Sequence, residues 1–148
     1  HKVDIFYNYK YREYVMQDFL AKNGVLIELN GSSTGYDTKC NSELKSCRQP
    51  SGSFQFDKQN DPLKRSRDCN VHFYYFGEFD KTDRLTSVIC VSGKDCRFIE
   101  LVKRKQYEYL LKAESRGSTG QRLRDNISIS KKEIIANSDN CVIMDNKC

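Results

Sequence analysis

Apolar and polar residues follow one another along this chain in short runs that predict several strands and two or three helices. Residues 9–23 predict a helix, because apolar side chains recur on one face and Asn23-Gly24 is a typical helix stop. The apolar residues on that face are Val15, Met16, Phe19 and Leu20. The run VLIEL (25–29) then predicts a short buried strand.

The middle of the chain predicts a loop followed by strands. Residues 37–53 are polar and irregular, and two cysteines there indicate a loop held by a crosslink. GSFQFD (52–57) predicts a short strand. Residues 69–102 are dense in β-forming residues and contain two polar turns, so they predict three strands. These strands are CNVHFYYFGEF, RLTSVICV and CRFIELV, separated by DKTD and SGKD.

The last third of the chain predicts two helices and two strands. Residues 103–115 have helical spacing, and the apolar residues on one side are Tyr107, Leu110 and Leu111. We therefore expect Tyr107 to pack in the core. Residues 123–129 and CVIM (141–144) predict strands. Between them, Ser130-Lys131-Lys132-Glu133 has the form of a capping box that opens a short helix.

These elements predict an α+β fold. Strands outnumber helices and do not alternate with them, which favours an antiparallel sheet accompanied by two or three helices. The length of 148 residues is typical of one domain, so we expect a single domain over residues 1–148.

Seven cysteines indicate a disulfide-stabilised, secreted domain. They lack the paired CxxC spacing of a zinc site or a thioredoxin motif, and only two histidines are available to complete a metal cage. Disulfides form in oxidising compartments, so secretion follows if the thiols are paired. The alternative is an intracellular protein with free thiols. The cysteines are Cys40, Cys47, Cys69, Cys90, Cys96, Cys141 and Cys148.

One disulfide is predicted from hairpin geometry. A turn centred on Gly93 places Cys90 opposite Cys96 in adjacent antiparallel strands. Directly opposed residues at such a position have Cα atoms about 4.5 Å apart, within the range that a disulfide tolerates. We therefore expect a Cys90–Cys96 bridge. The alternative, in which each pairs elsewhere, stays open because six cysteines alone allow about 15 connectivities.

Processing and modification sites also suit a secreted protein. Asn30-Gly31-Ser32 and Asn126-Ile127-Ser128 are glycosylation sequons, so Asn30 and Asn126 are expected to carry glycans in surface loops. No apolar run approaches the roughly 20 residues of a membrane span, and none has the form of a signal peptide. Secretion therefore requires a signal already removed, with His1 near the mature start. Lys64-Arg65 resembles a dibasic processing site, although an exposed basic loop is the alternative.

Positive charge is concentrated late in the chain. The net charge is +5, and residues 103–132 carry nine basic and three acidic side chains, a balance of +6. Such a segment suits an acidic macromolecule, a host protein above all, unless it is only a solvated face. Tyrosines interleaved with lysines would also suit RNA, a less favoured partner. The expected partner-binding residues are Lys103, Arg104, Lys105, Lys112, Arg116, Arg122 and Arg124.

Catalytic signatures are scarce. No GxSxG, P-loop, HExxH or EF-hand motif is present. His1 and His72 have the residue types of an N-terminal copper site, but the other features of copper monooxygenases are missing, so we expect no metal and no cofactor. An unpaired seventh cysteine would be a nucleophile only beside a histidine or a cation. We therefore expect no enzyme activity.

The segment VHFYYFGEFDKTDRLTSVICVSGKDCRFIEL (71–101) resembles the C-terminal hairpin of secreted fungal guanyl-specific ribonucleases, and more closely the ribonuclease-like effectors of powdery mildew fungi. The shared features are an aromatic strand, an L-x-x-V-I strand, a Gly turn and an F-[IV]-E strand. Residues 102–148 have no counterpart. The resemblance places the catalytic His of the ribonucleases on Val91 and their catalytic Arg on Phe73, which implies a scaffold without the acid and cation of the chemistry.

These observations predict a secreted, effector-like interaction protein that acts extracellularly, or inside a host, by binding rather than by turnover. A secreted ribonuclease-like hydrolase that uses His72 with Glu78 or Glu100 is one alternative. A small cytokine or toxin recognised by a receptor is another.

Overall fold

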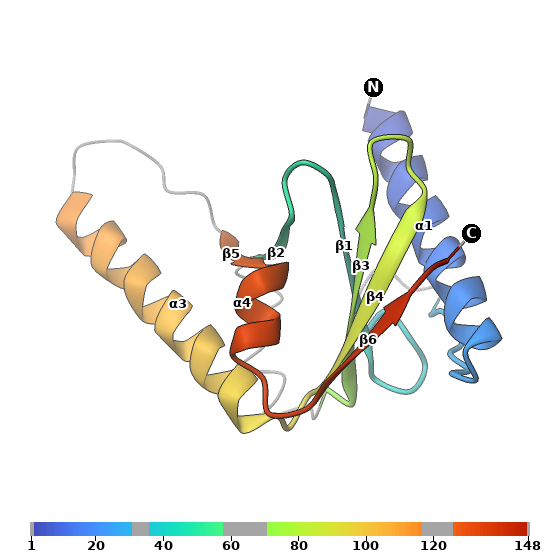
Figure 1. The fold of residues 1–148 in the computed structure, drawn as a ribbon. Coiled ribbons are helices and arrows are strands. Elements are labelled where there is room, and N and C mark those ends of the chain that lie inside the picture. Colours follow the sequence, from blue (N-terminus) through green and yellow to red (C-terminus); the bar gives the residue numbers. More distant parts are fainter. Residues whose placement is uncertain (1, 31–35, 58–70, 117–125, 148) are drawn as a thin grey trace.

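Two sheets and three helices make up the described part of this α+β protein (Figure 1). The computed structural model describes residues 2–30, 36–57, 71–116 and 126–147. In chain order the elements are α1 (Lys2–Lys22), β1 (Glu43–Arg48), β2 (Ser53–Asp57), β3 (Phe73–Phe79), β4 (Leu85–Ser92), α3 (Cys96–Arg116), β5 (Asn126–Ser130), α4 (Lys131–Ala136) and β6 (Cys141–Asp145).

The larger sheet is mixed rather than antiparallel. Its strand order is β1-β3-β4-β6, and β2 pairs with β5 in a separate two-stranded sheet. β4 is antiparallel to both β3 and β6, as expected, but β1 is parallel to β3. β1 (ELKSCR) lies within the stretch expected to be an irregular, crosslinked loop, so that prediction was wrong. A polar parallel edge strand lacks both a hairpin turn and clear apolar alternation, the two local signals of strand pairing.

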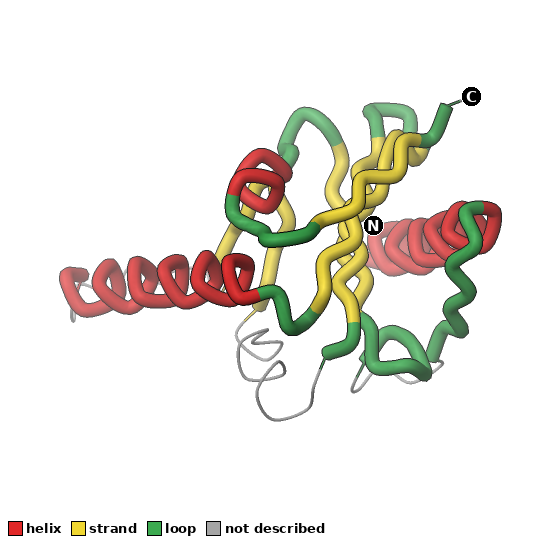
Figure 2. The backbone as a smooth tube through the Cα atoms, turned by 60° about the horizontal axis from the view of Figure 1, so that its bottom comes forward, coloured by secondary structure: helices red, strands yellow, loops and turns green. Residues whose placement is uncertain are grey.

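The larger sheet is covered on both sides (Figure 2). α1 lies against one side, while β2, β5, α3 and α4 lie on the other. Burial on both sides explains why β3 and β4 contain continuous apolar runs, FYYF and VICV, instead of alternating patterns. The predicted strands at 69–79 and 84–91 are thus confirmed, with β3 beginning at Phe73.

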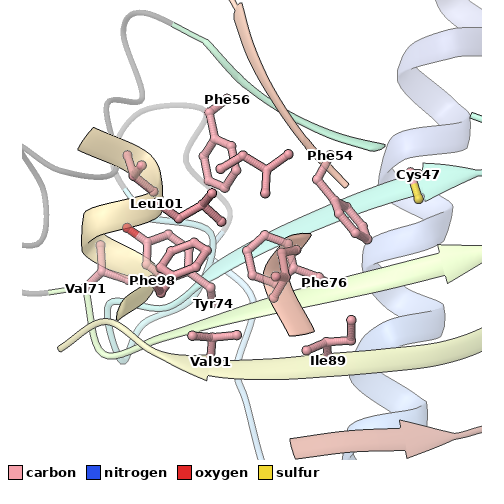
Figure 3. Packing of buried hydrophobic residues seen from close by; sticks show 13 residues of the cluster. Cys47, Phe54, Phe56, Val71, Tyr74, Phe76, Ile89, Val91, Phe98 and Leu101 are labelled. Atoms are coloured by element: carbon pink, nitrogen blue, oxygen red, sulfur yellow. The ribbon is translucent and has the colours of Figure 1, made fainter. Parts of the chain in front are cut away.

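Aromatic side chains fill the core between the two sheets (Figure 3). Phe54 of β2 packs on Phe76 of β3 with ring centroids 5.0 Å apart. Tyr74 of β3 meets Phe98 of α3 at 5.3 Å. Such tilted pairs contribute beyond their buried area. This core therefore fixes the first turns of α3 against the larger sheet.

On the other side of the sheet, α1 buries the side chains that its sequence predicts. Met16, Phe19 and Leu20 are buried, and the helix ends before Gly24, which has a φ of +81°. A Cβ at Gly77 of β3 would lie 2.7 Å from Sδ of Met16, so this glycine allows the helix to approach closely. The helix is longer than predicted, because it begins at Lys2.

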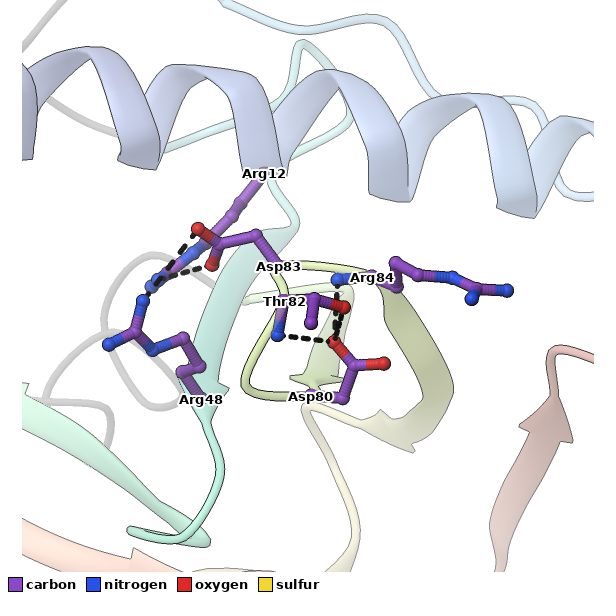
Figure 4. Close-up of polar contacts among 6 residues, drawn as sticks. All are labelled: Arg12, Arg48, Asp80, Thr82, Asp83 and Arg84. Carbon is purple, nitrogen blue, oxygen red and sulfur yellow. Dashed lines mark hydrogen bonds and ion pairs between the residues drawn. The ribbon is translucent and has the colours of Figure 1, made fainter.

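An ion-pair cluster joins α1 and β1 to the β3–β4 turn (Figure 4). Nη2 of Arg12 lies 3.1 Å from Oδ1 of Asp83, and the Arg12 guanidinium covers the Phe79 ring at 5.5 Å. Nη1 of Arg48 approaches Oδ2 of Asp83 at 3.8 Å. Asp80 shapes the same turn by accepting hydrogen bonds from the backbone N–H groups of Thr82 and Arg84.

Two predicted strands are wrong. VLIEL (25–29) is extended but joins no sheet beyond a single bridge from Leu29 to Thr38, and the Leu26 side chain is 85% exposed. CRFIELV forms the first two turns of α3. Its buried residues Phe98, Leu101 and Val102 follow helical i, i+3, i+4 spacing, which overrides the β-propensity of the individual residues.

The Cys90–Cys96 disulfide is not formed, because the hairpin it required does not exist. Cys90 lies in β4 opposite Tyr75 and Val142, whereas Cys96 begins α3. A Cβ at Gly93 would lie 1.8 Å from the Val71 carbonyl oxygen, so the chain passes close to residue 71 there instead of forming the centre of a hairpin. The cysteines within the described ranges are all free thiols, namely Cys40, Cys47, Cys90, Cys96 and Cys141.

The C-terminal elements match their sequence signals closely. The Ser130 hydroxyl accepts a hydrogen bond from the Glu133 N–H, and the Glu133 carboxylate accepts one from the Ser130 N–H, as in the predicted capping box. Both strands predicted in this part of the chain, at 123–129 and 141–144, are present as β5 and β6 with shifted ends. Nζ of Lys131 reaches Glu78 and Ser87, which ties α4 to the larger sheet.

Asp95 connects α3 to the start of β6. Its side chain accepts hydrogen bonds from the N–H groups of Phe98 (3.0 Å), Asp139 (2.9 Å) and Asn140 (3.1 Å). Burial acts most strongly and would raise the pKa of Asp95, but these backbone donors outweigh it and hold the pKa below its ordinary 3.8. One carboxylate thus caps a helix and fixes a distant turn.

Replacing Asp95 should destabilise the fold. Asp95→Ala removes a helix cap and leaves buried donors without a partner, so we expect it to lower the free energy of unfolding by about 2–3 kcal/mol. Because the folded pKa is depressed, the contribution is complete above pH 3.8 and is lost as the pH falls through the lower folded value. Urea titrations at pH 7 and pH 3 measure both effects, with Asp18→Ala on the exposed face of α1 as control. Equal stability of Asp95→Ala and Asp18→Ala at pH 7 would contradict this role.

A second titrating group, Glu13, is partly buried on α1. Burial, reinforced by Asp37, raises the pKa of Glu13 to about 7. A raised carboxyl pKa means that the protonated form of Glu13 is favoured in the folded state. The stabilising effect of this protonated carboxyl is complete below pH 4.5 and is lost as the pH rises through 7.

Glu13→Gln should therefore stabilise the protein at alkaline pH and change little at acid pH. The neutral amide mimics the protonated acid, which removes the cost of a half-buried charge near Asp37. Melting temperatures at pH 4.5 and pH 8.5 test this. A difference between variant and parent that is the same at both pH values would show that Glu13 titrates normally.

Candidate partner-binding surface on α3

The first half of α3 is fixed to the rest of the protein. Phe98, Leu101 and Val102 are buried in the core. Nζ of Lys105 lies 2.6 Å from Oε2 of Glu133, so an ion pair joins α3 to α4. The Arg97 guanidinium donates a hydrogen bond of 2.7 Å to the last carbonyl of α4. The position of the helix is therefore set by its N-terminal turns.

The second half of α3 projects away from both sheets (Figures 1 and 2). Tyr107 lies about two and a half turns after the buried Phe98 and hence on the opposite face. The exposed fractions of Tyr107, Leu110 and Leu111 are 64%, 62% and 47%. The prediction that these residues share one side agrees with this geometry, but the expected core packing of Tyr107 is wrong.

We call the outward-facing residues of α3 the outer stripe. Its members recur at helical spacing and combine a basic end with an apolar centre. They are Lys103, Arg104, Tyr107, Leu110 and Leu111. The sequence carries a signal for this orientation, but the periodicity of residues 103–115 taken alone does not reveal it. The earlier apolar residues Phe98, Leu101 and Val102 form a competing helical face, and that face takes the core position.

The basic residues expected to bind a partner do not form one surface. Lys103 and Arg104 are exposed on the outer stripe, and Lys103 makes a loose ion pair of 3.5 Å with Glu100. Lys105 points to the opposite side and is neutralised by Glu133. Lys112 is exposed, whereas the side chain of Arg116 and the whole of Arg122 and Arg124 lie outside the described residues. Only the start of the predicted basic segment thus faces outward beside apolar residues.

The acid–base pair of the ribonuclease alternative is not assembled. His72 precedes β3, and its ring lies tilted against that of Phe73, with ring centroids 4.6 Å apart. Glu78 lies six residues further along the same strand direction, roughly 20 Å away. Glu100 is exposed on α3 and pairs with Lys103. Within the described residues, no hydrogen bond or ion pair joins His72 to either acid.

The positions that correspond to ribonuclease catalytic residues lie on different sides of the sheet. Val91 is buried in the core between the sheets, while Phe73 packs on the side of α1. The first two strands of the segment that carries the resemblance form the β3–β4 hairpin. Its third strand, around Phe98, is helical, so that shared feature is absent.

The thiols of Cys47 and Cys90 are poor nucleophiles. Burial raises the pKa of Cys90 to about 11. Burial is also the main influence on Cys47, where Glu78 adds to it and the pKa again rises to about 11. At neutral pH these thiols stay protonated, and the thiolate is the reactive form.

The remaining predicted sites are only partly described. Asn30 is exposed, and its side-chain amide donates a hydrogen bond to the Tyr36 carbonyl. Asn126 begins β5 opposite Asp57 and so lies in a strand rather than in the expected loop. His1 and the Lys64-Arg65 pair lie outside the described residues.

The described ranges hold neither a metal-binding cluster nor a membrane-spanning helix. No group of three or more His, Cys, Asp or Glu side chains there lies close enough to hold a metal ion. None of the helices in those ranges is long and apolar enough to cross a membrane.

Comparisons with known proteins give no relatives. No family model, no curated protein and no solved structure matches this chain.

We predict that the purified protein does not cleave RNA above a heat-denatured control. Within the described residues, His72 makes no hydrogen bond or ion pair with Glu78 or Glu100, so the expected acid–base pair is not joined. A fluorescent oligoribonucleotide assay with chelator present measures this, and His72→Ala serves as the matched variant. Cleavage that disappears in His72→Ala would restore the hydrolase alternative.

Proposed function

We propose that this chain is a secreted, effector-like interaction protein that binds a partner protein through the outer stripe of α3. One observation carries the proposal: a helix held firmly at its N-terminal half presents Tyr107, Leu110 and Leu111 to solvent on one face. Large apolar side chains gathered on an exposed surface mark interaction sites more often than isolated ones do. Tyrosine is also among the residues that dominate binding energy in interfaces.

The chemistry of the stripe suits a groove in an acidic protein. An amphipathic helix docks by laying anchors at i, i+3, i+4 spacing into an apolar groove. Tyr107, Leu110 and Leu111 have this spacing, and Lys103 and Arg104 precede them on the same side. A groove with carboxylates at the end that meets Lys103 would complement both features.

A nucleic-acid partner fits this surface less well. Binding of single strands needs aromatic faces on which bases stack, together with several cations along the backbone. The stripe offers one tyrosine, two leucines and only two cations, Lys103 and Arg104, and its neighbouring Lys105 is paired with Glu133. We therefore favour a protein, and nucleic-acid binding becomes an outcome that the experiments would reveal.

Secretion remains part of the proposal on sequence grounds. Seven cysteines, the two sequons and the exposed Asn30 support it. The free thiols of the described cysteines lend it no further support.

The partner surface can be located by photo-crosslinking. A benzophenone amino acid placed at Tyr107 should give an adduct with one protein in host extracts, because that side chain lies at the centre of the stripe. The same probe at Tyr14, which is 56% exposed on α1, is the control. Identical adducts from both positions, or adducts with nucleic acid alone, would contradict the proposal.

With the crosslinked protein purified, two changes to the stripe should have different kinetic effects. Leu110→Ala with Leu111→Ala should weaken affinity at least tenfold, mainly through faster dissociation. Lys103→Glu with Arg104→Glu should slow association several-fold and reduce its dependence on salt between about 50 and 300 mM. Lys81→Glu with Lys94→Glu, at exposed turns elsewhere, matches the charge change. If this control slows association equally, only net charge matters.

A further inference from the structure

Among the described residues, the outer edge of the larger sheet is open along β6. β6 pairs with β4 on one side, and among the described residues no other strand pairs with it. Its side chains Val142 and Ile143 are 58% and 42% exposed. Proteins usually protect an edge strand with lysine, proline or a bulge, because its unpaired backbone groups are a template for another chain. β6 (CVIMD) has none of these in its interior.

Hydrogen bonding shows which backbone groups face outward. The N–H of Asn146 donates to the carbonyl of Thr86, which is its direct partner in the β4–β6 register. Bonded and non-bonded pairs alternate along an antiparallel ladder. Val142 and Met144 therefore direct their N–H and C=O groups toward β4. The groups of Cys141, Ile143 and Asp145 point away from the sheet.

These outward groups are self-complementary. An antiparallel copy of β6, related by a two-fold axis at Ile143, would pair Ile143 with its own counterpart and Cys141 with Asp145 of the second copy. All of these residues present outward backbone groups, so about six hydrogen bonds could form without any slip in register. Val142 would lie beside Met144 of the second copy, which joins apolar side chains on one side of the sheet.

The charges near β6 also favour this register. Asp145 is the only charged residue in the strand, and the two-fold axis places it opposite Cys141 rather than opposite another carboxylate. Opposite charges across neighbouring strands are favourable, whereas like charges are not.

We propose that β6 is a homodimerisation edge, at which two copies join their four-stranded sheets into one continuous sheet about a two-fold axis at Ile143. This interface is separate from the outer stripe of α3 and leaves it available. A contact between two short strands is small, so the dimer should dissociate in the range of about 10–100 µM.

Sedimentation velocity under reducing conditions, which exclude intermolecular disulfides, tests the proposal. The parent protein should shift from monomer to dimer as its concentration rises from about 1 to 300 µM. Ile143→Lys and Ile143→Glu should each remain monomeric, because the axis places identical charges side by side. An equimolar mixture of the two variants should again form dimers. Leu110→Lys on the outer stripe is the matched control and should dimerise like the parent.

Amide exchange supplies an independent reading that does not depend on substitutions. The Ile143 amide should exchange about three- to sevenfold more slowly at the high concentration, because a dimer of this affinity still leaves a fraction of monomer, while the Met144 amide, already bonded to β4, should not change. A parent that is monomeric at 300 µM would overturn the proposal. So would dimers that survive in Ile143→Lys but are lost in Leu110→Lys, since association would then occur through α3. A monomeric parent leaves the binding experiments on the outer stripe unaffected, whereas association through α3 would show that the stripe binds a second copy of this chain.

Discussion

The carboxylate of Asp95 holds together the parts of this protein that face outward. It caps α3 through Phe98 and fixes the turn before β6 through Asp139 and Asn140. The direction in which α3 leaves the core therefore depends on the same group that brings β6 to the edge of the sheet. Burial alone would make this carboxylate costly, but hydrogen bonds from backbone N–H groups offset that desolvation. Both proposed interaction surfaces rest on this arrangement.

Local chemistry allowed several elements to be predicted from the sequence. The capping box at Ser130 formed as expected, because its two hydrogen bonds need only residues three apart. β3 and β4 formed for a similar reason, since dense β-forming residues flank a short polar turn shaped by Asp80. The apolar face of α1 was also correct, although its first residues lack the periodicity that would have marked the start at Lys2.

Features that depend on distant partners could not be predicted in the same way. β1 carries little β-propensity, and its parallel pairing with β3 arises from tertiary contact. Phe98 and Val102 suggested a strand residue by residue, and the core selected a helix from their spacing. That choice turned Tyr107 outward and so created the candidate surface. The count of charges along the sequence assigned both Lys103 and Lys105 to the partner-binding surface. On the helix they lie on opposite sides, and Lys105 pairs with Glu133.

The division of strands between the two sheets has a consequence for how the chain folds. Gln55 of β2 bonds to Ser128 of β5, 73 residues later, and β6 completes the larger sheet from the far end of the chain. Neither sheet can close until residues 126–145 have left the ribosome. Contacts so distant in sequence make folding slow, and the core around the β3–β4 hairpin stays incompletely covered until β5 and β6 have been made. During that interval the nascent protein is a natural client for chaperones.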